Sequence, residues 1–195
     1  MEFALHHLYH VYNRGNNKQP IFFSDANYVF FLQKVRKYIT PVCSILTYAL
    51  MPNHFHFLIH ADERTVLAKK TTLPHKSMLS EGFRHLLSSY TQAINEQNKS
   101  TGSLFQQNTK SKCLSEGDGA YAITCFHYIH QNPRKAGLVS KMEDWKYSSF
   151  NDFAGRRSGT LCNKQLAWEL LDIDPATFYE DSYKIIPDEM IINLF

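Results

Sequence analysis

The segment LMPNHFHFLIH, residues Leu50 to His60, decides how this chain folds. A Pro-Asn pair at its start separates two β-prone runs, which predicts an antiparallel hairpin. Side chains on a strand alternate between two faces, so His54, His56 and His60 share one face and the apolar residues between them share the other. The hairpin therefore offers one apolar face to a core and one face that carries imidazoles.

Further elements are predicted on both sides of this hairpin. They are a strand at 8–14, a helix at 24–39, a helix at 78–97, a weaker strand at 111–115 and a helix from 119 to 130 that Pro133 and Gly137 stop or turn. This order is typical of an α+β, ferredoxin-like fold, in which an antiparallel sheet carries helices on one face. We expect residues 1–150 to form the main domain and residues 151–195 a C-terminal extension, in part helical.

Composition narrows the class of protein. The chain has 195 residues, of which 44% are hydrophobic, and this is enough for one substantial core. The longest apolar run is too short for a membrane span, and the N-terminal residues do not resemble a signal peptide, so we expect a cytoplasmic location and no membrane partner. The four cysteines form no CxxC pair, which argues against a zinc knuckle or a disulfide framework. A net charge of +3, with basic and amide-rich segments in the first 150 residues, is compatible with a polyanionic partner.

His54 and His56 lie about 7 Å apart at the backbone on an ideal strand, so both rings can reach one metal ion. A solvent-facing strand carrying two histidines is the more common interpretation of such a pair taken alone. Tyr128 and Asn132 stand four residues apart in the last predicted helix and share a face, which ordinary packing also explains. Together, the two pairs supply two imidazole ligands, an amide oxygen as a third ligand and a phenol as nucleophile.

These four side chains suit phosphoryl chemistry. A phenol has a pKa near 10 and attacks poorly unless its target is made more electrophilic. A divalent metal does this by polarising a phosphoryl oxygen. Attack by tyrosine on a phosphodiester stores the bond as a phosphotyrosine, so no ATP is needed.

Five segments of the chain resemble the HUH single-tyrosine transposases, and most closely the REP-associated tyrosine transposases. The segments are YHVYNRGNNKQPIF (9–22), YALMPNHFHFLI (48–59), TGSLFQ (101–106), YIHQNPRKAGLV (128–139) and EDWKYSSF (143–150). They cover about the first 150 residues in the order and spacing of that family. Each segment alone is a modest signal, whereas five in register are highly specific.

The resemblance implies a fold, a reaction and a set of site residues. His54 and His56 match the metal-binding histidines, with Mg²⁺ or Mn²⁺ as the expected cofactor, and Asn132 matches the amide that completes the site. Tyr128 matches the tyrosine that attacks single-stranded DNA beside a hairpin, becomes joined to the 5′ phosphate and frees a 3′ hydroxyl. Strand transfer then reverses this chemistry.

DNA contacts are expected from basic side chains, each of which is also explained as a solvated surface charge. They are Arg14, Lys18, Arg84, Lys110 and Lys112. Relatives usually carry a basic residue near Asn108 and more arginines on the helix at 78–97, so DNA contact there is less well supported. We interpret His60 as a supporting or surface residue, and His127 and His130 as structural.

Two alternatives stay open at this point. The first is a catalytically idle protein that binds DNA hairpins. The second is a metal-dependent nuclease that forms no covalent intermediate and therefore tolerates Tyr128→Phe. Members of the family act as monomers or as dimers with shared active sites, and the sequence decides neither this, nor the target DNA, nor the role of residues 151–195.

Overall fold

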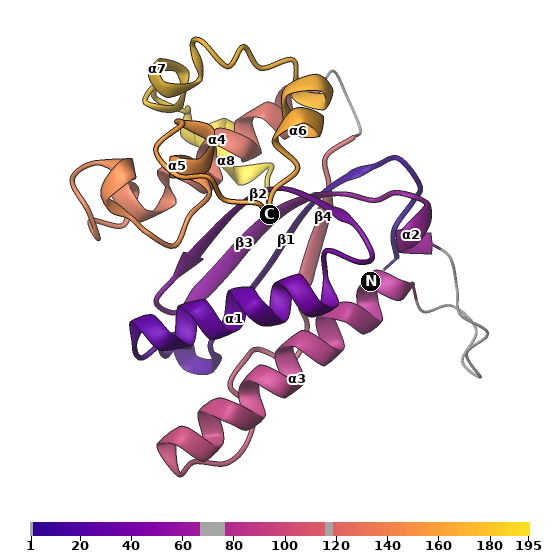
Figure 1. The fold of residues 1–195 in the computed structure, drawn as a ribbon, viewed down its shortest axis with the longest axis vertical. Helices are drawn as coiled ribbons and strands as arrows, with labels where there is room; N and C mark the ends of the chain where they lie inside the picture. Colours follow the sequence, from indigo (N-terminus) through magenta and orange to yellow (C-terminus); the bar gives the residue numbers. More distant parts are fainter. Residues whose placement is uncertain (1, 67–76, 116–118) are drawn as a thin grey trace.

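The computed structural model describes residues 2–66, 77–115 and 119–195 and is built on one four-stranded antiparallel sheet (Figure 1). The strands are β1 (Leu8–Arg14), β2 (Ser44–Met51), β3 (His54–His60) and β4 (Lys110–Cys113), in the spatial order β2-β3-β1-β4. The predicted α+β class is confirmed, and so is the predicted strand near residue 111.

Helices fill most of the chain between and after the strands. Their bounds are η1 (Asn16–Lys18), α1 (Asp25–Tyr38), α2 (Glu63–Val66), α3 (Met78–Asn98), α4 (Ala120–Lys135), η2 (Met142–Asp144), α5 (Phe150–Phe153), α6 (Lys164–Leu171), α7 (Phe178–Ser182) and α8 (Asp188–Ile192). Within the described ranges, none of them combines the length and apolar character that a membrane span requires.

The pairing of β1 with β3 determines which side chains surround the histidines. Tyr12 stands opposite His56 and Arg14 stands opposite His54. Residues directly opposite each other in an antiparallel pair point to the same face of the sheet. The register therefore places a phenol and a guanidinium beside the two imidazoles.

The apolar face of the sheet packs against α1 and α3. The ring of Phe55 on β3 lies 5.4 Å from that of Phe31 on α1 and 6.5 Å from that of Phe83 on α3, between centroids. The two helices also contact each other closely, because Gly82 on α3 leaves room for the backbone of Tyr38. The prediction that the helices lie on one face of the sheet is correct for these two helices only, because α4 packs on the other face.

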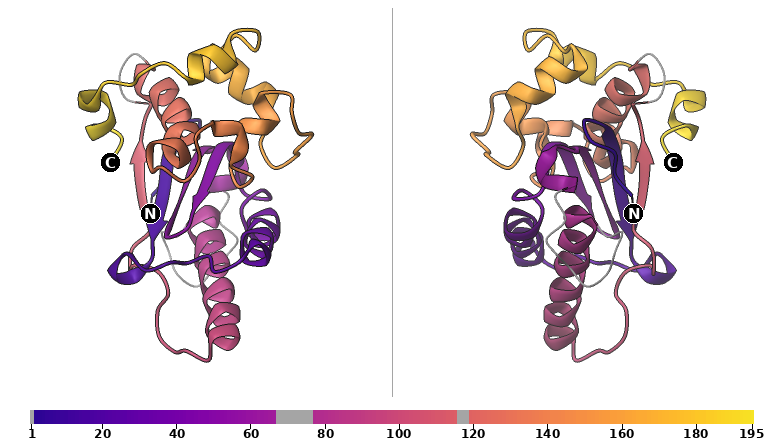
Figure 2. Two further views of the ribbon diagram at one scale, coloured as in Figure 1. Left: turned by 90° about the vertical axis from the view of Figure 1, so that its left-hand side faces the viewer. Right: turned by 90° about the vertical axis from the view of Figure 1, so that its right-hand side faces the viewer.

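Helix α4 lies across the opposite face of the sheet, over β2 and β3, with the later helices beyond it (Figures 1 and 2). His130 anchors it, because its Nε2 lies 2.8 Å from Oγ1 of Thr47 on β2. The helix runs through Pro133 to Lys135, so of the two residues predicted to stop or turn it, Pro133 does not stop it. A proline in the last turn costs few backbone hydrogen bonds, and the positive φ of Gly137 ends the helix instead.

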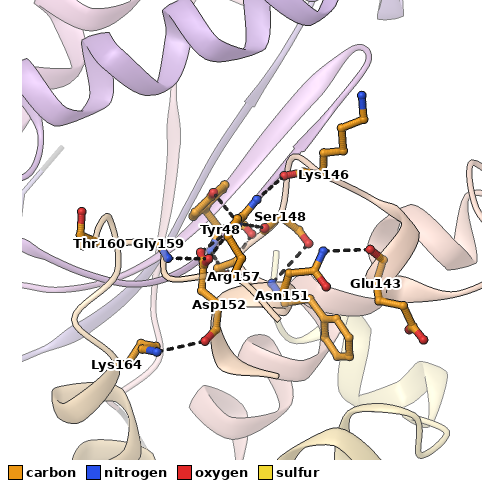
Figure 3. Close-up of polar contacts among 12 residues, drawn as sticks. Tyr48, Glu143, Lys146, Ser148, Asn151, Asp152, Arg157, Gly159, Thr160 and Lys164 are labelled. Atoms are coloured by element: carbon orange, nitrogen blue, oxygen red, sulfur yellow. Dashed lines mark hydrogen bonds and ion pairs between the residues drawn. The ribbon is translucent and has the colours of Figure 1, made fainter. Parts of the chain in front are cut away.

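Residues after 145 are attached to the edge of the sheet. The backbone N–H groups of Leu50 and Ser149 donate to the carbonyls of Tyr147 and Tyr48, at 2.8 and 3.0 Å. Close by, Nε of Arg157 lies 2.6 Å from Oδ1 of Asp152, whose side chain is buried (Figure 3). The sequence left the role of residues 151–195 open, and in the structure they pack on β2 and on α4.

Candidate active site

A pocket of about 300 Å³ opens on the face of the sheet that α4 covers. Side chains from β1, β3, β4, α4, the loop before β4 and the last residue line it: Tyr12, Asn13, Arg14, His54, His56, Gln106, Lys110, Tyr128 and Phe195. The pocket thus gathers two of the three predicted metal ligands, the predicted nucleophile and two of the predicted DNA-contacting cations.

The convergence of Tyr128 with the histidines follows from local geometry. Strand alternation points His54 and His56 to the same side, with ring centroids 4.9 Å apart. Tyr128 lies in the middle of α4, and its ring centroid is 6.0 Å from that of His56. The two elements are about seventy residues apart in sequence, and the packing of α4 on β3 brings them together.

His54 is oriented by its neighbour in the hairpin turn. Its Nδ1 lies 2.6 Å from Oδ1 of Asn53, and Nδ2 of Asn53 donates to the carbonyl of Lys18 at 3.1 Å. This second bond fixes which end of the amide faces the ring, so Nδ1 of His54 carries the hydrogen and Nε2 keeps its lone pair. Burial and the nearby Arg14 lower the pKa of His54 to about 4, which keeps the ring neutral.

His56 is buried more deeply and contacts a second histidine. Its Nδ1 lies 2.8 Å from Nε2 of His10 on β1. Burial holds the pKa of His56 well below its ordinary value and lowers that of His10 to about 4, so both rings are neutral. Sequence reasoning missed His10. The available signal was its position on the predicted strand 8–14, where it shares a face with Tyr12 and Arg14.

Asn132 lies one turn after Tyr128 on α4 and is buried rather than lining the pocket. Its Nδ2 has no hydrogen-bond partner among the described residues. Burial raises the pKa of the Tyr128 phenol, and the neighbouring Asn132 amide opposes that rise. The phenol therefore holds its proton at neutral pH.

The donor atoms of these residues fit a divalent cation. Neutral imidazoles and an amide oxygen are established metal ligands, and amide oxygen suits Mg²⁺ and Mn²⁺. Across the described residues, no three His, Cys, Asp or Glu side chains form a metal-binding cluster. A cation held by His54 and His56 would thus need a ligand of another type, and the amide oxygen of Asn132 is the predicted one.

The five basic residues predicted to contact DNA do not lie together. Arg14 and Lys110 line the pocket. Lys112 is exposed on β4 and Lys18 is exposed in η1. Arg84 lies on α3, in a separate groove of about 730 Å³, where its Nε bonds Oε2 of Glu81 at 2.8 Å.

Phe195 is one of four pocket residues that the sequence did not single out, and the others are Tyr12, Asn13 and Gln106. Its ring centroid lies 5.7 Å from that of Tyr128 and 6.2 Å from that of His56. The same ring also packs against His10 and Tyr12 on β1, and the sequence holds no signal for contacts over so long a separation.

The three remaining histidines singled out from the sequence lie outside the pocket. His60 shares the face of His54 and His56 at the far end of β3, beside His6. His127 on α4 bonds Oγ of Ser182 on α7 at 3.0 Å through Nδ1, and His130 bonds β2 as described above.

Comparison with known proteins adds one finding. No protein-family model matches this sequence, and no curated protein matches it. Among solved structures, that of a REP-associated tyrosine transposase bound to a REP hairpin superposes with a TM-score of 0.53 at 16% sequence identity, over 84% of this chain and 94% of the other. The chain is therefore similar in fold, over most of its length, to a REP-associated tyrosine transposase.

Proposed function

We propose that this protein is a metal-dependent transposase that cleaves single-stranded DNA beside a hairpin and rejoins the strands through a phosphotyrosine intermediate. The observation that carries the proposal is the pocket in which Tyr128 meets His54 and His56, with Arg14 and Lys110 at its wall. The fold similarity to a transposase bound to a hairpin supports it.

The reaction exchanges one phosphoester bond for another. The phenolic oxygen of Tyr128 bonds to phosphorus while the bond to the 3′ oxygen breaks, and the departing 3′ oxygen takes up a proton. The DNA is left with its 5′ phosphate on Tyr128 and a free 3′ hydroxyl. In strand transfer, a 3′ hydroxyl attacks the phosphotyrosine and restores the phenol.

The residues around Tyr128 divide the remaining tasks. His54, His56 and Asn132 would hold Mg²⁺ or Mn²⁺, which makes a phosphodiester more electrophilic when bound. Arg14 and Lys110 provide positive charge for the phosphate. Because burial raises the pKa of the phenol, its proton must leave as the new bond forms rather than beforehand.

One observation favours a second candidate, a hairpin-binding protein that does not cleave. The ring of Phe195 packs in the pocket against Tyr128, where a phosphodiester would have to enter. The fold and the basic residues would serve such a protein equally well.

The decisive experiment uses a labelled single-stranded DNA hairpin with flanking sequence, incubated with the full chain and Mn²⁺ and separated on a denaturing gel. We expect a covalent protein–DNA adduct that Tyr128→Phe abolishes. Tyr121→Phe, on the same helix but outside the pocket, is the matched control and keeps the adduct. Cleavage that survives Tyr128→Phe would indicate a nuclease without a covalent step, and binding without cleavage would indicate the idle protein.

A further inference from the structure

A chain of two hydrogen bonds runs through the buried rings behind the pocket. The carbonyl oxygen of Leu194 lies 2.8 Å from Nδ1 of His10, and Nε2 of His10 lies 2.8 Å from Nδ1 of His56. His10 is fully buried and His56 is 3% exposed, so water does not compete for these bonds.

The direction of both bonds follows from the chemistry of their ends. A carbonyl oxygen only accepts, so Nδ1 of His10 carries a hydrogen and donates it to Leu194. A neutral imidazole has one N–H, so Nε2 of His10 is the acceptor. Nδ1 of His56 must then be the donor, and the lone pair of His56 is left on Nε2.

We infer that His10 is a positioning residue that fixes the tautomer and ring orientation of His56, so that Nε2 of His56 is the nitrogen available to a divalent cation. This inference rests on the proposed function and deepens it. Asn53 does the same for His54 through a bond on its Nδ1. Both imidazoles thus use Nδ1 for support and keep Nε2 free, which is the arrangement typical of metal-binding histidines.

The position of His10 favours this role over simple core packing. His10 lies on β1, next to β3, on the face that carries His56, and both of its nitrogens are engaged. His130 is equally buried, but Nε2 bonds Thr47 and Nδ1 has no partner among the described residues. His130 is therefore the matched control for the loss of a buried imidazole.

The first test reads the tautomers directly in the metal-free, full-length protein. Long-range ¹H–¹⁵N correlation spectra distinguish a protonated Nδ1 from a protonated Nε2. We expect His10, His54 and His56 all to carry the hydrogen on Nδ1. A hydrogen on Nε2 of His56 would overturn the inference, because that nitrogen would then have no lone pair for a cation.

The second test measures Mn²⁺ binding from the electron paramagnetic resonance signal of the free ion. His10→Leu removes the acceptor, and we expect it to weaken Mn²⁺ binding about 10-fold to 100-fold. His10→Gln, whose amide oxygen can accept from His56, should restore most of the affinity, and His130→Leu should leave it within about threefold. Unchanged affinity in a folded His10→Leu would contradict the inference, as would failure of His10→Gln to restore binding.

The two proposals fail in different ways. A wild type that shows these tautomers and binds Mn²⁺, but forms no DNA adduct, would contradict the proposed cleavage and leave the role of His10 supported. An adduct together with a hydrogen on Nε2 of His56 would do the reverse. Should His10→Leu not fold, the spectra of the wild type still decide the matter.

Discussion

Buried neutral histidines make the stability of this protein sensitive to acid. Burial lowers the pKa of His10 to about 4 and holds those of His56 and His130 well below 6.5. The unfolded chain takes up protons on these rings near pH 6.5, whereas the folded chain does not. Their contribution to stability is therefore complete above about pH 6.5 and is lost as the pH falls toward the folded pKa values.

Urea denaturation at a series of pH values should show that the free energy of unfolding falls steeply as the pH drops below 6.5. Each of these imidazoles adds about 1.4 kcal/mol per pH unit to the loss in unfolding free energy. His130→Gln should flatten the slope by about one such step. A free energy of unfolding that stays constant from pH 7 to pH 5 would show that the rings are not held neutral.

Two histidines on the same face of β3 can be compared to test whether a role in the reaction depends on lying in the pocket. His54 lies in the pocket, whereas His60 lies outside it at the other end of β3. We expect His54→Ala to reduce Mn²⁺-dependent adduct formation on the order of 100-fold, since the proposed metal ligand is lost. His60→Ala should stay within about threefold in the same gel assay. Equal effects of the two changes would argue against His54 as a ligand.

Short-range periodicity predicted which site residues share a face within one element, but not how the elements pack together. Strand alternation placed His54 and His56 on one face, and four-residue spacing placed Tyr128 with Asn132. That Asn132 is buried rather than lining the pocket depends on how α4 tilts across the sheet, which no local pattern encodes. Phe195 packs against His10 and Tyr12, and these contacts span nearly the whole chain.

Among the elements, α1 and α3 depend on one small residue at their crossing. A Cβ added to Gly82 would lie 2.5 Å from the carbonyl oxygen of Tyr38, which is backbone and cannot rotate away. Gly82→Ala should lower the free energy of unfolding by about 1–3 kcal/mol through overpacking, even though alanine favours helices. Ser88→Ala, exposed on the same helix, should be neutral or slightly stabilising. Chemical denaturation compares the two, and a stabilised Gly82→Ala would contradict the close crossing.

Most elements were predictable because hydrophobic period and turn residues are local signals. The hairpin at Pro52 and Asn53, the start of α1 near residue 24 and the order of the elements all followed from them. The path of α4 through Pro133 did not, because packing of the preceding turns outweighs one lost hydrogen bond. Nor did the sequence show that α4 would lie on the face away from α1 and α3.

At the scale of the whole molecule, the segment after 150 is held by a buried carboxylate. Asp152 is 2% exposed and accepts from Nε and Nη2 of Arg157 at 2.6 and 2.9 Å (Figure 3). Arg157→Met leaves this charge without its partner, and we expect a loss of about 3 kcal/mol in unfolding free energy. Arg156→Met removes an exposed neighbour that forms an ion pair with Glu143 at 3.8 Å, and should cost less than about 1 kcal/mol.

Thermal or urea denaturation of the two arginine variants decides this point. Equal stability of both would show that the buried pair does not hold the segment in place. The boundary at residue 150 stays a prediction, although Arg157 also donates through Nη2 to the carbonyl of Ser148 and to the Tyr48 hydroxyl on β2.

The backbone that runs beside β2 has a consequence for self-association. Tyr147 and Ser149 occupy hydrogen-bonding groups at that margin of the sheet, so a second copy has no free strand edge to extend there. The other margin is β4, four residues long with two exposed lysines, and such charges discourage edge-to-edge pairing. Two copies of this chain would accordingly meet through helices and loops rather than by joining their sheets, which also protects the protein from aggregation by strand addition.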